Sequence, residues 1–447
     1  MAQGAVIWLC RWHHPTVVST PARGLLKCPP LSPGSMRRTQ WTETGVSSAL
    51  CLLSLESHKG APFGSHYLPP ALISEAIAPF LHFDAPLPEQ LYVVGGRNNN
   101  QEPLDVVEMF DTWHGRWVEC PAMTQRRAGC AATALPDGRL VVVGGYDQGG
   151  IVTGVLSSCE VFDPMKQTWD PNFPELERSR WGHGCVTLGG LVYAVGGCAL
   201  RPGMPPTEDL METLSSCEVY DPQLGTWSQC SRLQTARAGS RLVALNEHQF
   251  TAVGGCDDVF GRAEMLSSVE LYDIRTKTWT LLNATLGIPR TTAAAVAMDE
   301  RQILVMGGAP SLSSAEVYRV PNTALARSDS DSDDSIEEPP AEDPQPMFKK
   351  IQDMSEGRMG CQAVAMKLPV PGQGFPHCSR QCVVVVGGEN GDEDWEQESP
   401  MVRQFSHVLV FDAEVGAWRS DNAVPVIPTP RTAMALCLAP GRVRGHA

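Results

Sequence analysis

The sequence lacks the marks of several large classes of protein. No apolar run reaches the roughly 20 residues of a membrane-spanning helix, which argues against a membrane span. Acidic residues outnumber basic ones, 50 against 35, for a net charge of −15. This balance argues against a nucleic acid or an anionic membrane as the partner, because both bind basic surfaces.

A cysteine framework is also missing. The 15 cysteines are odd in number, none forms a CxxC pair, and the closest spacing is Cys378-x-x-x-Cys382. Disulfide scaffolds and thiolate metal sites have paired, closer spacings. We therefore expect a reducing compartment and a cytoplasmic location.

The chain does contain a repeat. Six apolar runs end in a glycine pair, and the steps between pairs are 49, 52, 58, 53 and 80 residues. The pairs are Gly95-Gly96, Gly144-Gly145, Gly196-Gly197, Gly254-Gly255, Gly307-Gly308 and Gly387-Gly388. A period near fifty residues indicates one supersecondary unit copied several times.

Other features keep register with the glycines. The run before each pair, such as 140–143, is short and rich in β-branched residues, which predicts a buried strand. A Glu-x-Tyr/Phe-Asp segment follows, as at 218–221. In five units a tryptophan stands seven residues after the aromatic one: Trp117, Trp169, Trp227, Trp279 and Trp418. An arginine before small residues precedes each run: Arg127, Arg180, Arg237, Arg290, Arg358 and Arg431.

Each unit therefore predicts four short strands in one antiparallel blade. The glycine pair, the Glu-x-Tyr/Phe-Asp segment and the tryptophan together resemble the kelch repeat over about residues 90 to 438, and kelch proteins form β-propellers. Glycine at the strand end permits positive φ and close backbone approach. The expected fold is all-β, a six-bladed kelch-type propeller within residues 86–440.

The ends of the array predict how the ring closes. The first glycine strand, at 91–94, has no arginine-led strand before it, whereas residues 430–438 supply an extra one after Trp418. Pairing these two segments completes the first blade and removes the exposed sheet edges.

Several cysteines also follow the repeat. Cys130, Cys185, Cys361 and Cys437 fall on the arginine-led strands, and Cys159 and Cys217 share one position on the aromatic strands. This register favours small core side chains. Cys198 and Cys256 each follow a glycine pair in adjacent units and could face one another, which leaves a thiol pair or metal site there as an alternative.

Residues 1–85 lie outside the repeat and show no BTB, BACK or F-box pattern. The first acidic residue is Glu43, and several arginines precede it, which is compatible with an organelle transit sequence. We expect a largely disordered extension at 1–85 and a short tail at 441–447, with organelle targeting left open.

The fifth unit carries an insertion. After Tyr318, Phe348 replaces the tryptophan, and residues 322–346 are rich in Ser, Asp, Glu and Pro. Such a segment buries little apolar surface, so we expect a disordered acidic loop. Ser328 and Ser330, with Asp three places on, are candidate sites for an acidophilic kinase; the alternative is a solvated loop without a role.

Enzymatic chemistry finds little support. Some kelch-like proteins resemble galactose oxidase, which binds copper through Tyr and His, or the plant specifier proteins, with a Glu-x-x-x-Asp-x-x-x-His iron site. Here only Tyr67 and Tyr146 lie outside the repeat positions, no such triplet exists, and His183 and His407 lack a fellow ligand at metal spacing. We expect no enzyme, metal or cofactor; a metal-dependent kelch enzyme is the alternative.

The kelch resemblance implies a binding face. In kelch proteins the loops entering the arginine-led strand and those after the glycine pair share one face, where partner peptides dock. That face would collect Arg127, Tyr146, Arg180, Trp181, Arg237, Phe260, Arg290, Arg358 and Arg431. Exposed guanidiniums would suit an acidic or phosphorylated peptide. The alternative is that these arginines belong to the repeat and bind carbonyls of neighbouring blades.

The predicted function is accordingly a non-catalytic protein-interaction platform. Two long loops, 201–214 and 389–399, would join the binding face. Kelch rings often serve as substrate-recognition parts of ubiquitin ligases, so an adaptor role is a further hypothesis, with a partner chain supplying the ligase-binding domain.

Overall fold

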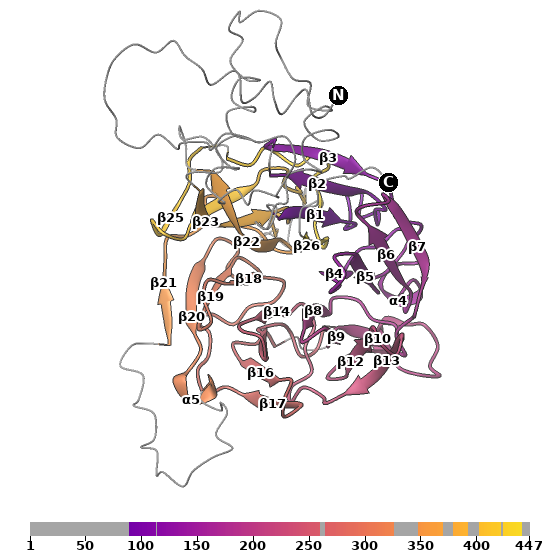
Figure 1. Cartoon of the computed structure of the whole chain (residues 1–447). Coiled ribbons are helices and arrows are strands. Elements are labelled where there is room, and N and C mark those ends of the chain that lie inside the picture. Colours follow the sequence, from indigo (N-terminus) through magenta and orange to yellow (C-terminus); the bar gives the residue numbers. More distant parts are fainter. Residues whose placement is uncertain are drawn as a thin grey trace, which may run out of the picture. The chain divides into compact units, whose positions relative to one another are not determined.

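The computed structural model describes residues 89–112, 114–259, 264–325, 347–369, 379–391, 402–421 and 423–439. They form six four-stranded antiparallel sheets around a common axis (Figure 1). The first strand of every sheet lies nearest the axis and the fourth lies on the outside. The predicted six-bladed β-propeller is confirmed.

The first three blades follow the repeat order. Blade 1 contains β26 (Ala435–Ala439), β1 (Gln90–Val94), β2 (Val107–Asp111) and β3 (Arg116–Cys120). Blade 2 contains β4 (Ala131–Ala134), β5 (Leu140–Val143), β6 (Cys159–Asp163) and β7 (Thr168–Phe173). Blade 3 contains β8 (Gly184–Leu188), β9 (Leu191–Val195), β12 (Cys217–Asp221) and β13 (Thr226–Cys230).

The other three blades repeat this order. Blade 4 contains β14 (Arg241–Ala244), β15 (Gln249–Val253), β16 (Val269–Asp273) and β17 (Thr278–Leu281). Blade 5 contains β18 (Ala294–Ala297), β19 (Gln302–Met306), β20 (Ala315–Arg319) and β21 (Phe348–Lys350). Blade 6 contains β22 (Gln362–Pro369), β23 (Ser379–Val386), β24 (Leu409–Asp412) and β25 (Ala417–Trp418).

Short elements decorate the loops. The helical turn α4 (Gly150–Thr153) follows the glycine pair of blade 2, and α5 (Asn322–Leu325) follows β20. In blade 3 the strands β10 (Cys198–Leu200) and β11 (Met211–Thr213) form a hairpin that contains the 3₁₀ turn η3 (Glu208–Leu210). Within the described residues, no helix has the length and apolar character needed to cross a membrane.

The C-terminal strand closes the ring as predicted. β26 pairs antiparallel with β1, with Leu91 opposite Leu438 and Val94 opposite Ala435. The strand begins at Ala435 rather than 430, because the preceding residues form the loop that carries Arg431. Closure covers the edge of β1, which would otherwise be open for pairing with another chain.

The core lies between blades. One cluster joins Leu91 and Phe110 of blade 1 to Met366 and Val384 of blade 6, and similar clusters fill the other interfaces. Because each sheet is covered by the next one, the glycine-ended strands are buried on both faces.

The repeat tryptophans link neighbouring blades through hydrogen bonds. Each indole N–H donates to a carbonyl of the linker from the preceding blade; for Trp227 the acceptor is Pro174, at 2.9 Å. The equivalent bonds join Trp117 to Pro425, Trp169 to Pro121, Trp279 to Ser231 and Trp418 to Gln352.

Blade 5 makes the hydrogen bond to the preceding blade with a different side chain. Phe348 stands opposite Tyr318, as the register of the repeat predicts, but its side chain is 45% exposed and has no N–H. The hydroxyl of Tyr318 donates instead to the carbonyl of Ala284, at 3.0 Å. The first four residues of the predicted disordered insertion, 322–325, form α5 instead. Its remainder, with Ser328 and Ser330, lies outside the described residues, as does the 1–85 segment.

A ring of backbone hydrogen bonds surrounds the axis. The residue two places after each arginine donates its N–H to the carbonyl of the equivalent residue in the preceding blade, at 2.8–3.1 Å. The six members have φ between 52° and 66°: Gly129, Gly182, Gly239, Thr292, Gly360 and Ala433. A left-handed backbone costs a non-glycine residue about 1–2 kcal/mol, so Thr292 and Ala433 hold this conformation because the ring requires it.

Closure predicts the effect of truncation. Deleting residues from Pro430 onward removes β26 and exposes the edge of β1, so the protein should lose its cooperative thermal transition and aggregate. Circular dichroism melts with size-exclusion chromatography measure both. A chain ending after Ala439 is the matched control and should melt like the full chain. A full-chain melting temperature in the longer deletion would contradict this closure.

Candidate interaction face

The six repeat arginines are buried. Each is at most 1% exposed: Arg127, Arg180, Arg237, Arg290, Arg358 and Arg431. They stand where the chain enters each first strand, as predicted, but their guanidiniums point into the blades. A peptide bound on the face would not reach them.

Arg180 shows the common arrangement. Its Nη1 donates to the carbonyls of Gly196 and Ser216, at 2.9 and 3.0 Å, and its Nη2 donates to Glu218, at 2.6 Å. Arg127, Arg237, Arg290 and Arg431 pair in the same way with Glu160, Glu270, Glu316 and Glu108, at 2.5–3.0 Å. Burial lowers the pKa of Arg237, and Glu270 opposes that shift. The glutamate of the Glu-x-Tyr/Phe-Asp segment is therefore the counter-charge of the arginine.

The glutamate also holds the loop that leads into the arginine strand. Glu218 accepts the backbone N–H of Glu177, at 2.6 Å, and Glu270 accepts that of Gln234, at 2.7 Å. The carbonyl of each arginine accepts the N–H of the second glycine in the preceding blade, at 2.8–3.0 Å. One residue thus joins its own blade through the side chain and the previous blade through the backbone.

Blade 6 departs from this rule. Leu409 occupies the glutamate position, and Arg358 pairs with Glu356, at 2.7 Å, and with the carbonyls of Gly387 and His407. Its guanidinium also lies over the ring of Phe405, at 4.6 Å from the centroid. The carboxylate of Glu356 and the ring of Phe405 thus take the place of the missing repeat glutamate.

The expected face of six exposed arginines is therefore wrong. The structural alternative holds, with one correction: the guanidiniums bind carbonyls of their own blade, and only the backbone reaches a neighbour. The physical reason is that the terminal N–H groups of a desolvated guanidinium need acceptors, which two backbone carbonyls and a carboxylate supply, as for Arg180.

Variable side chains surround the axis on this face. The residue after each arginine forms a backbone bridge with the residue after the glycine pair, so each blade contributes two members to a mouth ring. Its pairs are Thr432 and Arg97, Ala128 and Tyr146, Trp181 and Cys198, Ala238 and Cys256, Thr291 and Ala309, and Met359 and Glu389. Blades 4 and 5 supply small residues, whereas the other blades supply charged and aromatic ones.

The polar part of the mouth ring is tied together. Arg97 donates to Glu389, at 2.8 Å, although Arg97 keeps 28% of its side chain exposed. Tyr146 packs edge-on against Trp181, with ring centroids 5.9 Å apart. Burial raises the pKa of Tyr146, and Arg97 opposes this shift. The predicted face residues Tyr146 and Trp181 do lie here, but Tyr146 is buried, at 6% exposed, because it packs under Trp181 and Arg97. Phe260 falls outside the described residues.

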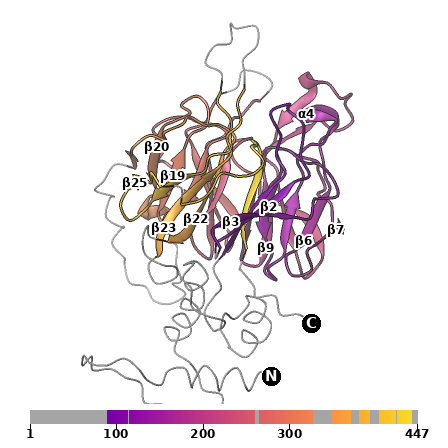
Figure 2. The same cartoon turned by 90° about the horizontal axis from the view of Figure 1, so that it is seen from above.

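An apolar cluster on blades 2 to 4 begins in the mouth ring, with which it shares Trp181, Cys198 and Ala238, and extends outward beside it. Its members are Val152, Val155, Trp181, Cys198, Leu200, Met211, Ala238 and Val259. Five of them are only partly buried, so the cluster is open to solvent. Figure 2 shows that α4, which carries Val152, projects from one end of the blade strands. The hairpin β10–β11 is held by Arg178, which donates to Glu212 and, at 3.0 Å, to the carbonyl of Leu200.

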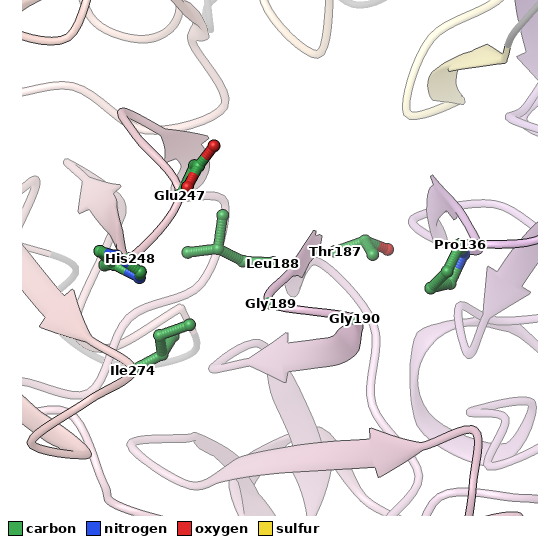
Figure 3. Close-up of a pocket in the computed structure, with 8 residues that line it drawn as sticks. All are labelled: Pro136, Thr187, Leu188, Gly189, Gly190, Glu247, His248 and Ile274. Carbon is green, nitrogen blue, oxygen red and sulfur yellow. The ribbon is translucent and has the colours of Figure 1, made fainter.

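The opposite face carries a pocket (Figure 3). Turns of blades 2, 3 and 4 line it with Pro136, Thr187, Leu188, Gly189, Gly190, Glu247, His248 and Ile274. Only one carboxylate and one imidazole are present, and the labelled side chains do not converge on a point (Figure 3). No cluster of three potential metal ligands occurs in the described part of the chain, Cys198 and Cys256 included.

Comparison with known proteins identifies the family. The model of the KLHDC2/KLHL20/DRC7 kelch-repeats domain matches residues 83–308. The chain belongs to the kelch-repeat family. Its kelch relatives include Kelch-like protein 25 of Xenopus tropicalis, 26% identical over 293 residues that cover 65% of this chain and 40% of that protein. Kelch-like protein 34 of Homo sapiens is 31% identical over 202 residues, which cover 45% of this chain and 29% of that protein.

The similarity is confined to the repeats. An F-box/kelch-repeat protein of Arabidopsis thaliana is 27% identical over 199 residues, which cover 43% of this chain and 47% of that protein. The chain thus spans less than half the length of these curated kelch relatives. Among solved structures, YjhT superposes with a TM-score of 0.52 at 13% identity, over 75% of this chain and 97% of its own, which shows the fold alone.

The kelch arginine–glutamate pairs predict a large cost for single neutralisation. Glu218→Gln leaves the Arg180 cation buried without its counter-charge, so the free energy of unfolding should fall by about 3–5 kcal/mol. Replacing both partners, as Arg180→Met with Glu218→Leu, should cost less than Glu218→Gln alone. Denaturant melts measure both, with exposed Glu102→Gln as the control. A loss for Glu218→Gln no larger than the control would contradict the assignment.

A buried histidine predicts a pH dependence. His183 is 3% exposed, and burial, with the nearby Arg180, lowers its pKa to about 3. Between pH 6.5 and 3 the unfolded chain binds a proton at His183 that the folded chain does not, so stability falls as the pH falls. At pH 4.5 this amounts to about 2–3 kcal/mol relative to neutral pH.

His183→Ser is the matched variant, because Ser240 occupies the equivalent position in blade 4. Its stability should decline less on acidification than that of the native chain. Parallel pH profiles of the two proteins would contradict a neutral buried His183.

Proposed function

We propose that this kelch-repeat chain is a non-catalytic protein-interaction platform whose partner segment docks over the apolar cluster beside the mouth ring. The observation that carries the proposal is the construction of that cluster. Loops from three blades converge on Trp181, and hydrogen bonds such as that from the Val259 N–H to Thr213, at 3.3 Å, hold these loops to one another.

The cluster is suited to an apolar anchor. The interblade cores account for the repeat's own hydrophobic residues, whereas the cluster's members come from loops that follow glycine pairs or arginines. Partly exposed valines and a tryptophan offer area that a leucine or aromatic side chain of a partner would desolvate. Residues of this kind supply most of the affinity in interfaces.

The charged residues around the apolar cluster indicate the charge of the partner. Asp147, Asp257 and Glu264 are at least partly exposed on the loops around the cluster, while Arg97 and Arg178 already have carboxylate partners. We therefore propose an apolar anchor with neutral or basic flanks. The sequence predicts an acidic or phosphorylated peptide instead. Because the six guanidiniums that would bind such a peptide are buried, its selection is the competing outcome of the test.

An adaptor role extends the proposal. Kelch-like and F-box/kelch-repeat proteins are among the relatives, and we propose that this chain recruits a substrate to a ubiquitin ligase, in the cytoplasm as the sequence predicts. In that role the propeller supplies recognition and a partner chain supplies the ligase. Accumulation of the docked partner on removal of this chain from cells would support it; unchanged partner levels would count against it.

A peptide selection tests the docking surface. Peptides selected from a random library on the full chain should contain an apolar anchor with neutral or basic flanks. Trp181→Ala should then weaken binding at least about 30-fold, because truncating an interface hot spot costs about 2 kcal/mol or more. Titration calorimetry gives the affinities, and a thermal melt of each variant confirms folding.

Ile274→Ala, in the pocket of the opposite face, is the matched control and should bind normally. Unchanged affinity of folded Trp181→Ala would overturn the proposed surface. Selection of acidic or phosphorylated sequences would overturn the proposed charge of the partner.

A further inference from the structure

Blade 3 places two cysteines side by side on adjacent strands. In the register of β12 and β13, Cys217 stands directly opposite Cys230. Opposed residues of an antiparallel pair have Cα atoms about 4.5–5.5 Å apart and side chains on the same face of the sheet. A disulfide spans Cα separations of about 4.4–6.8 Å, so this pair lies within its reach.

The pair is peculiar to blade 3 among the described strands. At the same register, blade 1 opposes Val107 to Cys120, and blade 2 opposes Cys159 to Phe173. The repeat therefore needs only an apolar side chain at each position. A second thiol opposite the first is not required for packing.

The two thiols differ in access. Cys217 is fully buried. Cys230 is partly exposed at the end of the outer strand. A hydrogen bond from Cys217 lowers the pKa of Cys230, while burial raises the pKa of Cys217. Cys230 is thus the thiol that ionises and that a small oxidant reaches first.

We propose that Cys217 and Cys230 are a redox-active thiol pair that hydrogen peroxide converts into a reversible disulfide. The Cys230 thiolate attacks the peroxide: an S–O bond forms, the O–O bond breaks, and the leaving hydroxide takes up a proton to become water. Cys217 then attacks the Cys230 sulfur as its own proton passes to the departing oxygen. The S–S bond forms and a second water leaves, so two thiols are oxidised and one peroxide is reduced.

The bond would fix the outer strand of blade 3, one of the three blades that contribute to the docking cluster. Cys217 follows Ser216, whose carbonyl accepts from Arg180, and the hairpin β10–β11 lies just upstream. The disulfide would tie this segment covalently to β13. Reduction by a thiol such as glutathione restores the open pair.

Peptide mapping of the full chain tests the pairing. Trypsin alone leaves residues 181–232 on one peptide, since Arg201 precedes proline, whereas further cleavage after Glu218 separates Cys217 from Cys230. After brief treatment with hydrogen peroxide and alkylation, segments 213–218 and 219–232 should appear joined. Their combined mass should be lower by about 2 Da than the sum of the free-thiol forms, and a reductant should separate them.

Two variants keep the test falsifiable. Cys217→Val reproduces Val269 of blade 4 and should fold; its Cys230 should then proceed to sulfinic acid instead of joining a partner. Oxidation should raise the melting temperature of the native chain by about 4 °C and leave that of Cys217→Val unchanged. Cys159→Val, which removes a cysteine without an opposed thiol, should behave like the native chain.

Failure of the two segments to join would overturn the proposal, as would pairing of Cys230 with a different cysteine. Equal yields of Cys230 sulfinic acid in the native chain and in Cys217→Val would also overturn it, because the resolving thiol would then have no role.

Discussion

The buried arginine–glutamate pair is the interaction on which the rest of the ring depends. Five blades bury a guanidinium and a carboxylate together, and an unpaired partner at such a site would carry a large desolvation cost. The pair also sets the path of the chain, since the glutamate holds the incoming loop and the arginine holds the glycine turn. Blade 6 keeps its arginine without that glutamate by recruiting Glu356 and Phe405, so the cation is the more constant member.

Neighbouring blades are coupled by main-chain groups around the axis and by side chains at the rim. Near the axis, the second glycine of each pair donates to the next arginine's carbonyl, and the ring through Gly182 and its equivalents closes on itself. At the rim, each tryptophan, or Tyr318 in blade 5, donates to the linker from the preceding blade. These contacts use the backbone or the side chains of repeat residues. The amino acids of the loops between them can therefore differ from blade to blade. The mouth ring and the apolar cluster are assembled from those loops.

Much of the fold follows from spacing alone. Glycine pairs, the aromatic residue seven places before a tryptophan and the surplus segment after Trp418 predict six blades, the strand order and the closure, because a repeated unit must bury its two faces against copies of itself. Phe348 was located opposite Tyr318 by the same register. The candidate site was predicted less well. The loops that the sequence assigns to one face do bring Tyr146, Trp181 and Glu389 to the axis. Arg97 and Val152 were not singled out, although reading the residue after each glycine pair as one column points to Arg97.

The sequence by itself determined the architecture, because periodic residues report local geometry that is the same in every blade. It did not determine the direction of the arginine side chains. An arginine at a loop entering a strand is equally consistent with an exposed cation and with a buried one, and the choice depends on acceptors far along the chain: for Arg180, Gly196, Ser216 and Glu218. Tertiary structure also decided which loops meet over blades 2 to 4. These are contacts between segments whose separation in sequence carries no periodic signal.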